Sequence, residues 1–232
     1  MENIIYIILL SIAIVLFKII FKINLKKAKE LNENKTLEKI TDKFPENIEV
    51  AKEMLEMLDN KSVKIEEAKD TKTSLYIAII NKISIADMKN NYARLQTIAH
   101  ECIHSCQDRT LLLFNFAFSN ISILYFLVVS ILTILKVVNN QMLQVAILML
   151  IMIIQFSVRS FLEIDAMTRA RFLAKEYMKK KKLCTEKEQK ELLKEYEKIN
   201  KVGIPFVIDN LLTTGLARAL IYCIISIISL DI

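Results

Sequence analysis

The sequence predicts a mainly α-helical membrane protein, with about four transmembrane helices and a small α+β region. Of its 232 residues, 53% are hydrophobic, yet 25% are charged. The two kinds are segregated, because long apolar runs alternate with stretches rich in Lys and Glu. Gly and Pro number only two each, which disfavours a loop-rich or all-β fold. Membrane spans joined by helical polar parts explain this pattern.

The first apolar run, Ile4–Phe21, has about the length that crosses a bilayer, which takes about 20 apolar residues. A cleaved signal peptide is the competing interpretation. The residues before the run carry no positive charge, and no small-x-small cleavage site follows it. We therefore predict that residues 1–23 form a retained N-terminal transmembrane anchor.

Two further apolar runs, Leu111–Leu135 and Met142–Leu162, are separated by a polar connector too short for anything but a helical hairpin. Residues 111–165 are therefore expected to form a transmembrane hairpin. A fourth run, Leu211–Leu230, places the last transmembrane helix within residues 203–232.

Polar residues interrupt the later spans. Gln155 and Arg159 lie near the end of the third span, and Arg218 lies in the first turns of the fourth. Charged side chains are costly in lipid, so this part of the hairpin is expected to face protein or water.

The net charge of +6 indicates a membrane surface as partner rather than nucleic acid, because no nucleic-acid module or aromatic–basic stripe is present. Lysines gather after the first span, including Lys26, Lys27 and Lys29, and again between residues 166 and 201. The positive-inside rule then places residues 24–110 and 166–201 in the cytoplasm and both termini outside. The lipid bilayer is the first predicted partner.

The region 24–110 is predicted to contain a helix and a strand. Apolar residues recur at helical spacing over Asn47–Asp59. Ser74–Asp87 is rich in β-branched residues and splits around Asn81, which predicts one strand or a short hairpin. Residues 166–202 are expected to form a basic polar helix.

The only two histidines of the chain, His100 and His104, are four residues apart. At about 100° per residue they lie about 40° apart on one helix face, one turn from each other. That spacing places two imidazoles on one Zn²⁺. Glu101 lies about 60° to the side of His104, where it can act as a base on a metal-bound water instead of ligating. This is the HExxH pattern of zinc peptidases.

A zinc site needs a third protein ligand, and no third histidine exists, so a carboxylate is required. The predicted hairpin returns Glu163 to the membrane face from which the motif helix departs. Ala166 and Ala170 share its helix face, leaving room for the motif helix. Asp165 points elsewhere and is expected to pair with Arg169, although it stays open as an alternative ligand.

Two stretches resemble the membrane-embedded neutral zinc metallopeptidases of bacteria. "HECIHSCQ" (100–107) is similar to that family's HExGHAxQ, and "EIDAMTRA" (163–170) to its E-x-D-A-x-R-A. The order of spans and polar parts is also similar to theirs and to that of HtpX-like membrane zincins. The sequence departs at Ile103 and Ser105, where the family has glycine and alanine. The resemblance implies a zincin-like region, a bacterial cell membrane and peptidase activity, and it supports Glu163 as a ligand.

These observations predict a membrane-bound zinc metalloendopeptidase that hydrolyses peptide or membrane-protein substrates. His100, His104 and Glu163 are the expected zinc ligands, and Glu101 is the expected general base on a zinc-activated water. One alternative is a non-catalytic zincin-like membrane adaptor, which would have no need of Glu101. Another is an intramembrane protease, which the polar character of residues 90–107 disfavours. An oxyanion-stabilising group is not identifiable; Arg159, Arg169 and Tyr177 are candidates.

Overall fold

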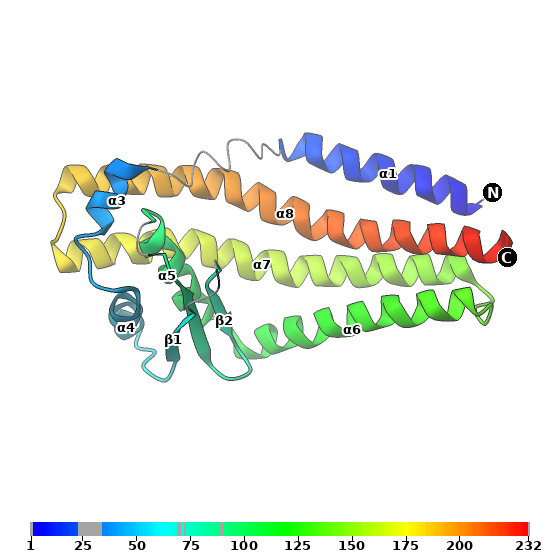
Figure 1. Ribbon diagram of the computed structural model, residues 1–232, viewed down its shortest axis with the longest axis horizontal. Helices are drawn as coiled ribbons and strands as arrows, with labels where there is room; N and C mark the ends of the chain where they lie inside the picture. Colours follow the sequence, from blue (N-terminus) through cyan, green and yellow to red (C-terminus); the bar gives the residue numbers. More distant parts are fainter. Residues whose placement is uncertain (1, 23–33, 69–70, 72, 89–90, 232) are drawn as a thin grey trace. The chain divides into compact units, whose positions relative to one another are not determined.

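The computed structural model describes residues 2–22, 34–68, 71, 73–88 and 91–231. Lys26, Lys27 and Lys29, which contribute to the predicted orientation, lie outside the described residues. The described chain is mainly helical with one three-stranded sheet (Figure 1). In chain order the elements are α1 (Glu2–Ile20), α3 (Lys35–Thr41), α4 (Asn47–Met57), β1 (Lys64–Ala68), β2 (Leu75–Ile77), β3 (Lys82–Ala86), α5 (Arg94–His104), α6 (Arg109–Ile134), α7 (Gln141–Lys181) and α8 (Glu186–Asp231).

Four helices, α1, α6, α7 and α8, are long and apolar enough to cross a membrane. This confirms the predicted number of candidate spans. The chain forms two compact units. The first comprises residues 1–23, 114–161 and 205–232, which are α1 and the apolar parts of α6, α7 and α8. The second unit comprises residues 24–113 and 162–204.

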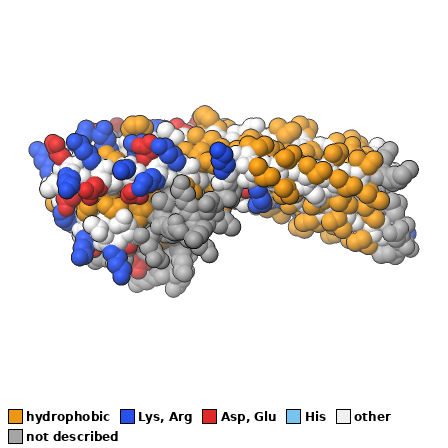
Figure 2. Space-filling view, turned by 90° about the horizontal axis from the view of Figure 1, so that it is seen from above, with side chains coloured by type: hydrophobic (Ala, Val, Ile, Leu, Met, Phe, Trp, Pro, Cys, Tyr) orange, Lys and Arg blue, Asp and Glu red, His pale blue; other side chains and the backbone are white. Residues whose placement is uncertain are grey.

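The first unit has a small core and a hydrophobic exterior. Its core includes Val129, Met152 and Tyr222. The Tyr222 hydroxyl donates to Thr133 Oγ1 at 2.9 Å, and Thr133 in turn donates to the Val129 carbonyl, so these buried polar atoms are paired. Figure 2 shows many hydrophobic side chains on the visible face of these helices, and exposed ones include Leu9, Leu124 and Ile228. Such an apolar exterior is suited to contact with lipid. The four long apolar helices are consistent with a multi-pass membrane protein.

In the second unit, α4 and α5 pack on the three-stranded sheet. The strand order is β1-β3-β2, with β3 parallel to β1 and antiparallel to β2. Alternate side chains of β3, Ile83 and Ile85, are fully buried in the core that α4 and α5 share. The β2–β3 pair is the predicted short hairpin, and Asn81 takes the left-handed conformation (φ 49°) in its turn. β1 was not expected, because "KIEEA" carries no clear alternation.

The predicted single polar helix over residues 166–202 differs from the structure. α7 continues to Lys181, and α8 begins at Glu186 and runs through Gly203 and Pro205 to Asp231. The break has a local cause: Thr185 Oγ1 accepts from the Glu188 N–H at 3.3 Å, and Glu188 Oε2 accepts from the Thr185 N–H at 2.8 Å. This reciprocal pair is a capping box, which starts a helix.

Candidate metal centre

The packing of α5 decides where its histidines point. One face of the helix carries Leu95, Ile98 and Cys102, all fully buried in the core of the second unit. Because these residues recur at helical spacing, the opposite face is turned away from the core. His100 and His104 lie on that opposite face, with 19% and 12% of their side chains exposed.

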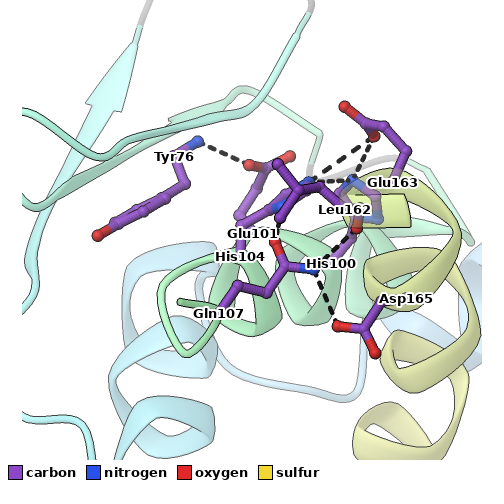
Figure 3. Close-up of polar contacts among 8 residues, drawn as sticks. All are labelled: Tyr76, His100, Glu101, His104, Gln107, Leu162, Glu163 and Asp165. Atoms are coloured by element: carbon purple, nitrogen blue, oxygen red, sulfur yellow. Dashed lines mark hydrogen bonds and ion pairs between the residues drawn. The ribbon is translucent and has the colours of Figure 1, made fainter. Parts of the chain in front are cut away.

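Glu163 of α7 lies beside both histidines (Figure 3). Its Oε2 is 3.5 Å from Nε2 of His100 and 3.7 Å from Nε2 of His104. The two Nε2 atoms are 3.0 Å apart. Among the described residues, these three side chains form a group whose ligand atoms can share one metal ion.

The three distances fit a zinc ion. Three atoms separated by 3.0, 3.5 and 3.7 Å lie on a circle with a radius of about 2.0 Å. Zinc binds imidazole nitrogen and carboxylate oxygen at about 2.0–2.2 Å, so an ion near the centre of this circle would reach all three. A tetrahedral ion with such bonds keeps its ligand atoms about 3.4 Å apart, which is the mean of the observed separations. The residue types also suit zinc, since two imidazoles with one carboxylate are a known catalytic ligand set.

Gln107 fixes the orientation of His104. Its Nε2 donates to the Leu162 carbonyl at 2.8 Å and to Asp165 Oδ2 at 2.9 Å. A carbonyl can only accept, so this orientation of the amide is required, and Gln107 Oε1 must be the atom 2.8 Å from Nδ1 of His104. Nδ1 of His104 therefore carries the hydrogen, and its Nε2 presents a lone pair towards His100 and Glu163. Gln107 thus orients one candidate ligand and also bonds to α7 on either side of Glu163.

Glu101 is buried and is held by the sheet. Its Oε2 accepts a hydrogen bond from the backbone N–H of Tyr76 in β2 at 2.7 Å (Figure 3). β2 is an edge strand, and its bond to Glu101 shows that the Tyr76 N–H is turned outward from β3. This contact holds one carboxylate oxygen of Glu101 in place. The other oxygen, Oε1, is the one that could take part in a reaction.

Burial and nearby charges shift the pKa values of both Glu101 and His104. Burial raises the pKa of Glu101, and the nearby histidines and the Tyr76 N–H offset this only in part. Burial lowers the pKa of His104, but the nearby carboxylates of Glu163 and Glu101 outweigh burial, so its net pKa is raised.

The structure brings together His100, His104 and Glu163, with Glu101 next to them in sequence. Asp165 is not part of the group: it accepts from Gln107, and its Oδ2 lies 3.3 Å from Nη1 of Arg169. That pair is the one expected from the sequence.

Of the candidates for an oxyanion-stabilising group, two are engaged elsewhere. Arg169 pairs with Asp165, and the Tyr177 hydroxyl donates to Glu53 at 2.6 Å. Tyr76 was not predicted from the sequence, because its contribution comes from its backbone and has no residue-type signal. Arg94, a fully buried arginine that anchors the start of α5, was not predicted either.

Comparison of the chain with protein families, curated proteins and solved structures finds no match.

Proposed function

We propose that the protein is a zinc-dependent metalloendopeptidase with a multi-pass membrane part. The observation that carries this proposal is the position of Glu163, whose carboxylate lies within 3.7 Å of both imidazoles of the HExxH helix. A chance HExxH segment has no reason to meet a distant carboxylate at zinc-ligand spacing. The Gln107 bridge adds support, because oriented histidines are typical of metal sites.

His100, His104 and Glu163 would hold the ion, each through one atom. A zinc ion held there would supply a Lewis acid to polarise the scissile carbonyl and lower the pKa of the attacking water. The role of the protein is to fix the three ligand atoms, and the buried face of α5 and the Gln107 bridge do this.

Glu101 is the proposed general base. Its Oε1 would take the proton from the attacking water as the oxygen bonds to the carbonyl carbon, and would pass that proton to the amide nitrogen as the C–N bond breaks. The Tyr76 N–H holds Oε2 during both transfers, so the carboxylate does not rotate away.

The outer edge of β2 is the proposed substrate-binding strand. The N–H and C=O of Tyr76 both point away from β3, because they belong to the same residue of the ladder. Since Glu101 uses the N–H, the Tyr76 carbonyl remains for an extended peptide to pair with. Such pairing suits peptide or membrane-protein substrates of varied sequence. The lysine distribution assigns this site to the cytoplasmic side.

The test uses the full-length protein in a mild detergent, with zinc per chain and cleavage of casein both measured. Glu101→Gln should keep zinc and lose cleavage by about 10²–10⁴-fold, because only the proton acceptor is removed. Glu163→Ala should lose both. Glu56→Gln, an exposed glutamate of α4, is the matched control and should change neither.

Two outcomes would refute the proposal. Unchanged cleavage in Glu101→Gln would remove the base from the mechanism. Zinc bound at one per chain without cleavage by the wild-type protein would instead favour the non-catalytic adaptor.

A further inference from the structure

A polar cavity lies between α7 and α8 in the first unit, among otherwise apolar helices. Its volume is about 160 Å³. α7 contributes Gln155 and Arg159, and α8 contributes Asn210, Thr214 and Arg218. Polar residues inside a membrane-spanning unit are costly and usually functional, so this cavity calls for a physical explanation.

The two arginines of the cavity have no acidic partner in the described part of the first unit. The sequence of that unit contains three acidic residues, Glu2, Asp209 and Asp231. Glu2 and Asp231 stand at the far ends of α1 and α8. Asp209 is half a helical turn, about 180°, away from Arg218 around α8, and its Oδ2 lies 3.7 Å from Nζ of Lys18.

Among the described residues, the hydrogen-bond partner of Arg218 is a neutral side chain. Its Nη1 donates to Oγ of Ser122 in α6 at 3.1 Å. Gln155 makes a parallel bond, from its Nε2 to Oγ of Ser119 at 3.1 Å. These bonds orient the polar groups but leave the guanidinium charge of Arg218 uncompensated.

We propose that this cavity binds the phosphate of an anionic phospholipid. Guanidinium groups pair with phosphate oxygens through two parallel hydrogen bonds, which is why arginine is favoured in phosphate sites. Asn210 and Thr214 add neutral donors beside the two charges. One phosphate would compensate both arginines, neither of which forms an ion pair with the acidic residues in the described part of the first unit.

The phosphate comes from a lipid rather than from solution because of where the cavity opens. Arg159, Asn210 and Thr214 are exposed on helices whose other exposed side chains include Ile153 and Ile221. Acyl chains can lie along these side chains while the phosphate enters the cavity. Figure 2 shows Lys or Arg side chains at the surface among the hydrophobic ones of this unit. Basic pockets between transmembrane helices bind anionic headgroups in this way.

The experiment uses delipidated full-length protein in a neutral detergent. Thermal unfolding gives its melting temperature, and native mass spectrometry detects bound lipid. The added probes are dioleoyl phosphatidylglycerol, dioleoyl phosphatidylcholine, dioleoyl glycerol and inorganic phosphate. Phosphatidylglycerol should raise the melting temperature and appear as a bound lipid, and phosphatidylcholine should need roughly tenfold more for the same effect. Dioleoyl glycerol, which has the chains without the phosphate, should have no effect.

The two test variants are Arg159→Gln and Arg218→Gln. The matched control is Lys136→Gln, which removes one positive charge from the α6–α7 connector. Each arginine variant should lose the phosphatidylglycerol response, and Lys136→Gln should keep it. Arg159 is exposed, so its variant reports on the site even if Arg218→Gln does not fold. A retained response in Arg159→Gln, or an equal response to dioleoyl glycerol, would overturn the proposal. An equal response to inorganic phosphate at the same concentration would overturn the lipid as its source.

Discussion

At the scale of single residues, the candidate centre depends on groups that are not themselves candidate ligands. Gln107 determines which nitrogen of His104 carries a hydrogen, and the Tyr76 N–H holds one oxygen of Glu101. Both contacts position a group that the proposed chemistry needs. Their effects can therefore be separated, because one concerns metal affinity and the other concerns proton transfer.

Gln107→Leu should weaken zinc binding by about 10–100-fold, because His104 loses the acceptor that fixes its tautomer. The measurement is competition with a chelator of known zinc affinity. Gln189→Leu is the matched control, since Gln189 donates to the Lys175 carbonyl and has no contact with the histidines. Equal affinity in the wild type and Gln107→Leu would contradict the positioning role.

Tyr76→Pro should lower kcat about tenfold or more while leaving zinc content unchanged, because the backbone donor to Glu101 is removed. Proline is tolerated at an edge strand when the missing N–H faces outward, as it does here. Tyr76→Phe keeps that N–H and loses only the hydroxyl bond to Asn81, so its kcat should match the wild type. Equal losses in both variants would assign the effect to the side chain instead.

At the scale of elements, α5 is anchored at both ends. Its C-terminal end is followed by Gln107, which bonds to α7, and its first residue is Arg94. The guanidinium of Arg94 donates to Asn47 Oδ1 and to the carbonyls of Thr41, Phe44 and Pro45, at 2.8–3.0 Å. This buried arginine joins the motif helix to the segment between α3 and α4, and burial lowers its pKa.

Arg94→Met should lower the free energy of unfolding by about 3 kcal/mol or more, because several buried acceptors lose their donor at once. The measurements are thermal unfolding and hydrogen exchange, which should speed up first between α3 and α4. Arg171→Met, which removes a half-exposed pair with Glu197, should cost no more than about 1 kcal/mol. Protection of the α3–α4 segment at the wild-type level would contradict the anchoring role.

The elements that the sequence predicted best are those with strong periodicity. The four spans and α4 follow from apolar length and spacing, and the histidines and Glu163 follow from ligand chemistry. The break between α7 and α8 also has a local signal in the sequence, the Thr185–Glu188 capping box. A single helix was nevertheless predicted there. β1 and Arg94 were not predictable in this way, because each depends on partners far away in the sequence: β3 for the strand, and Asn47 for the arginine.

At the scale of the whole molecule, the chain consists of a helical unit with a hydrophobic exterior and a second, more polar unit that contains the candidate centre. The hydrophobic exterior of the first unit is consistent with a bilayer. The second unit has an ordinary hydrophobic core, to which α3, α4, α5, the sheet and parts of α7 and α8 contribute. The side of the membrane on which the second unit lies is a prediction from lysine placement alone.

That orientation predicts which cysteines a membrane-impermeant maleimide can reach in intact cells. In a background with Cys102, Cys106 and Cys223 replaced by alanine, the half-exposed Cys184 should be labelled only after permeabilisation. Lys136→Cys, added to a background that also lacks Cys184, should be labelled in intact cells, because the α6–α7 connector is expected outside. The reverse pattern would place the polar unit on the outer side.

The central claim is that Glu163 binds zinc together with the two histidines. Comparing zinc binding by Glu163→Gln and Asp165→Asn tests this claim most directly. Glu163 lies within ligand distance of both histidines, whereas Asp165 bonds to Gln107 and Arg169. The account predicts about one zinc per chain in Asp165→Asn and at least tenfold weaker binding in Glu163→Gln. Zinc retained at wild-type affinity by Glu163→Gln, or lost only in Asp165→Asn, would contradict it.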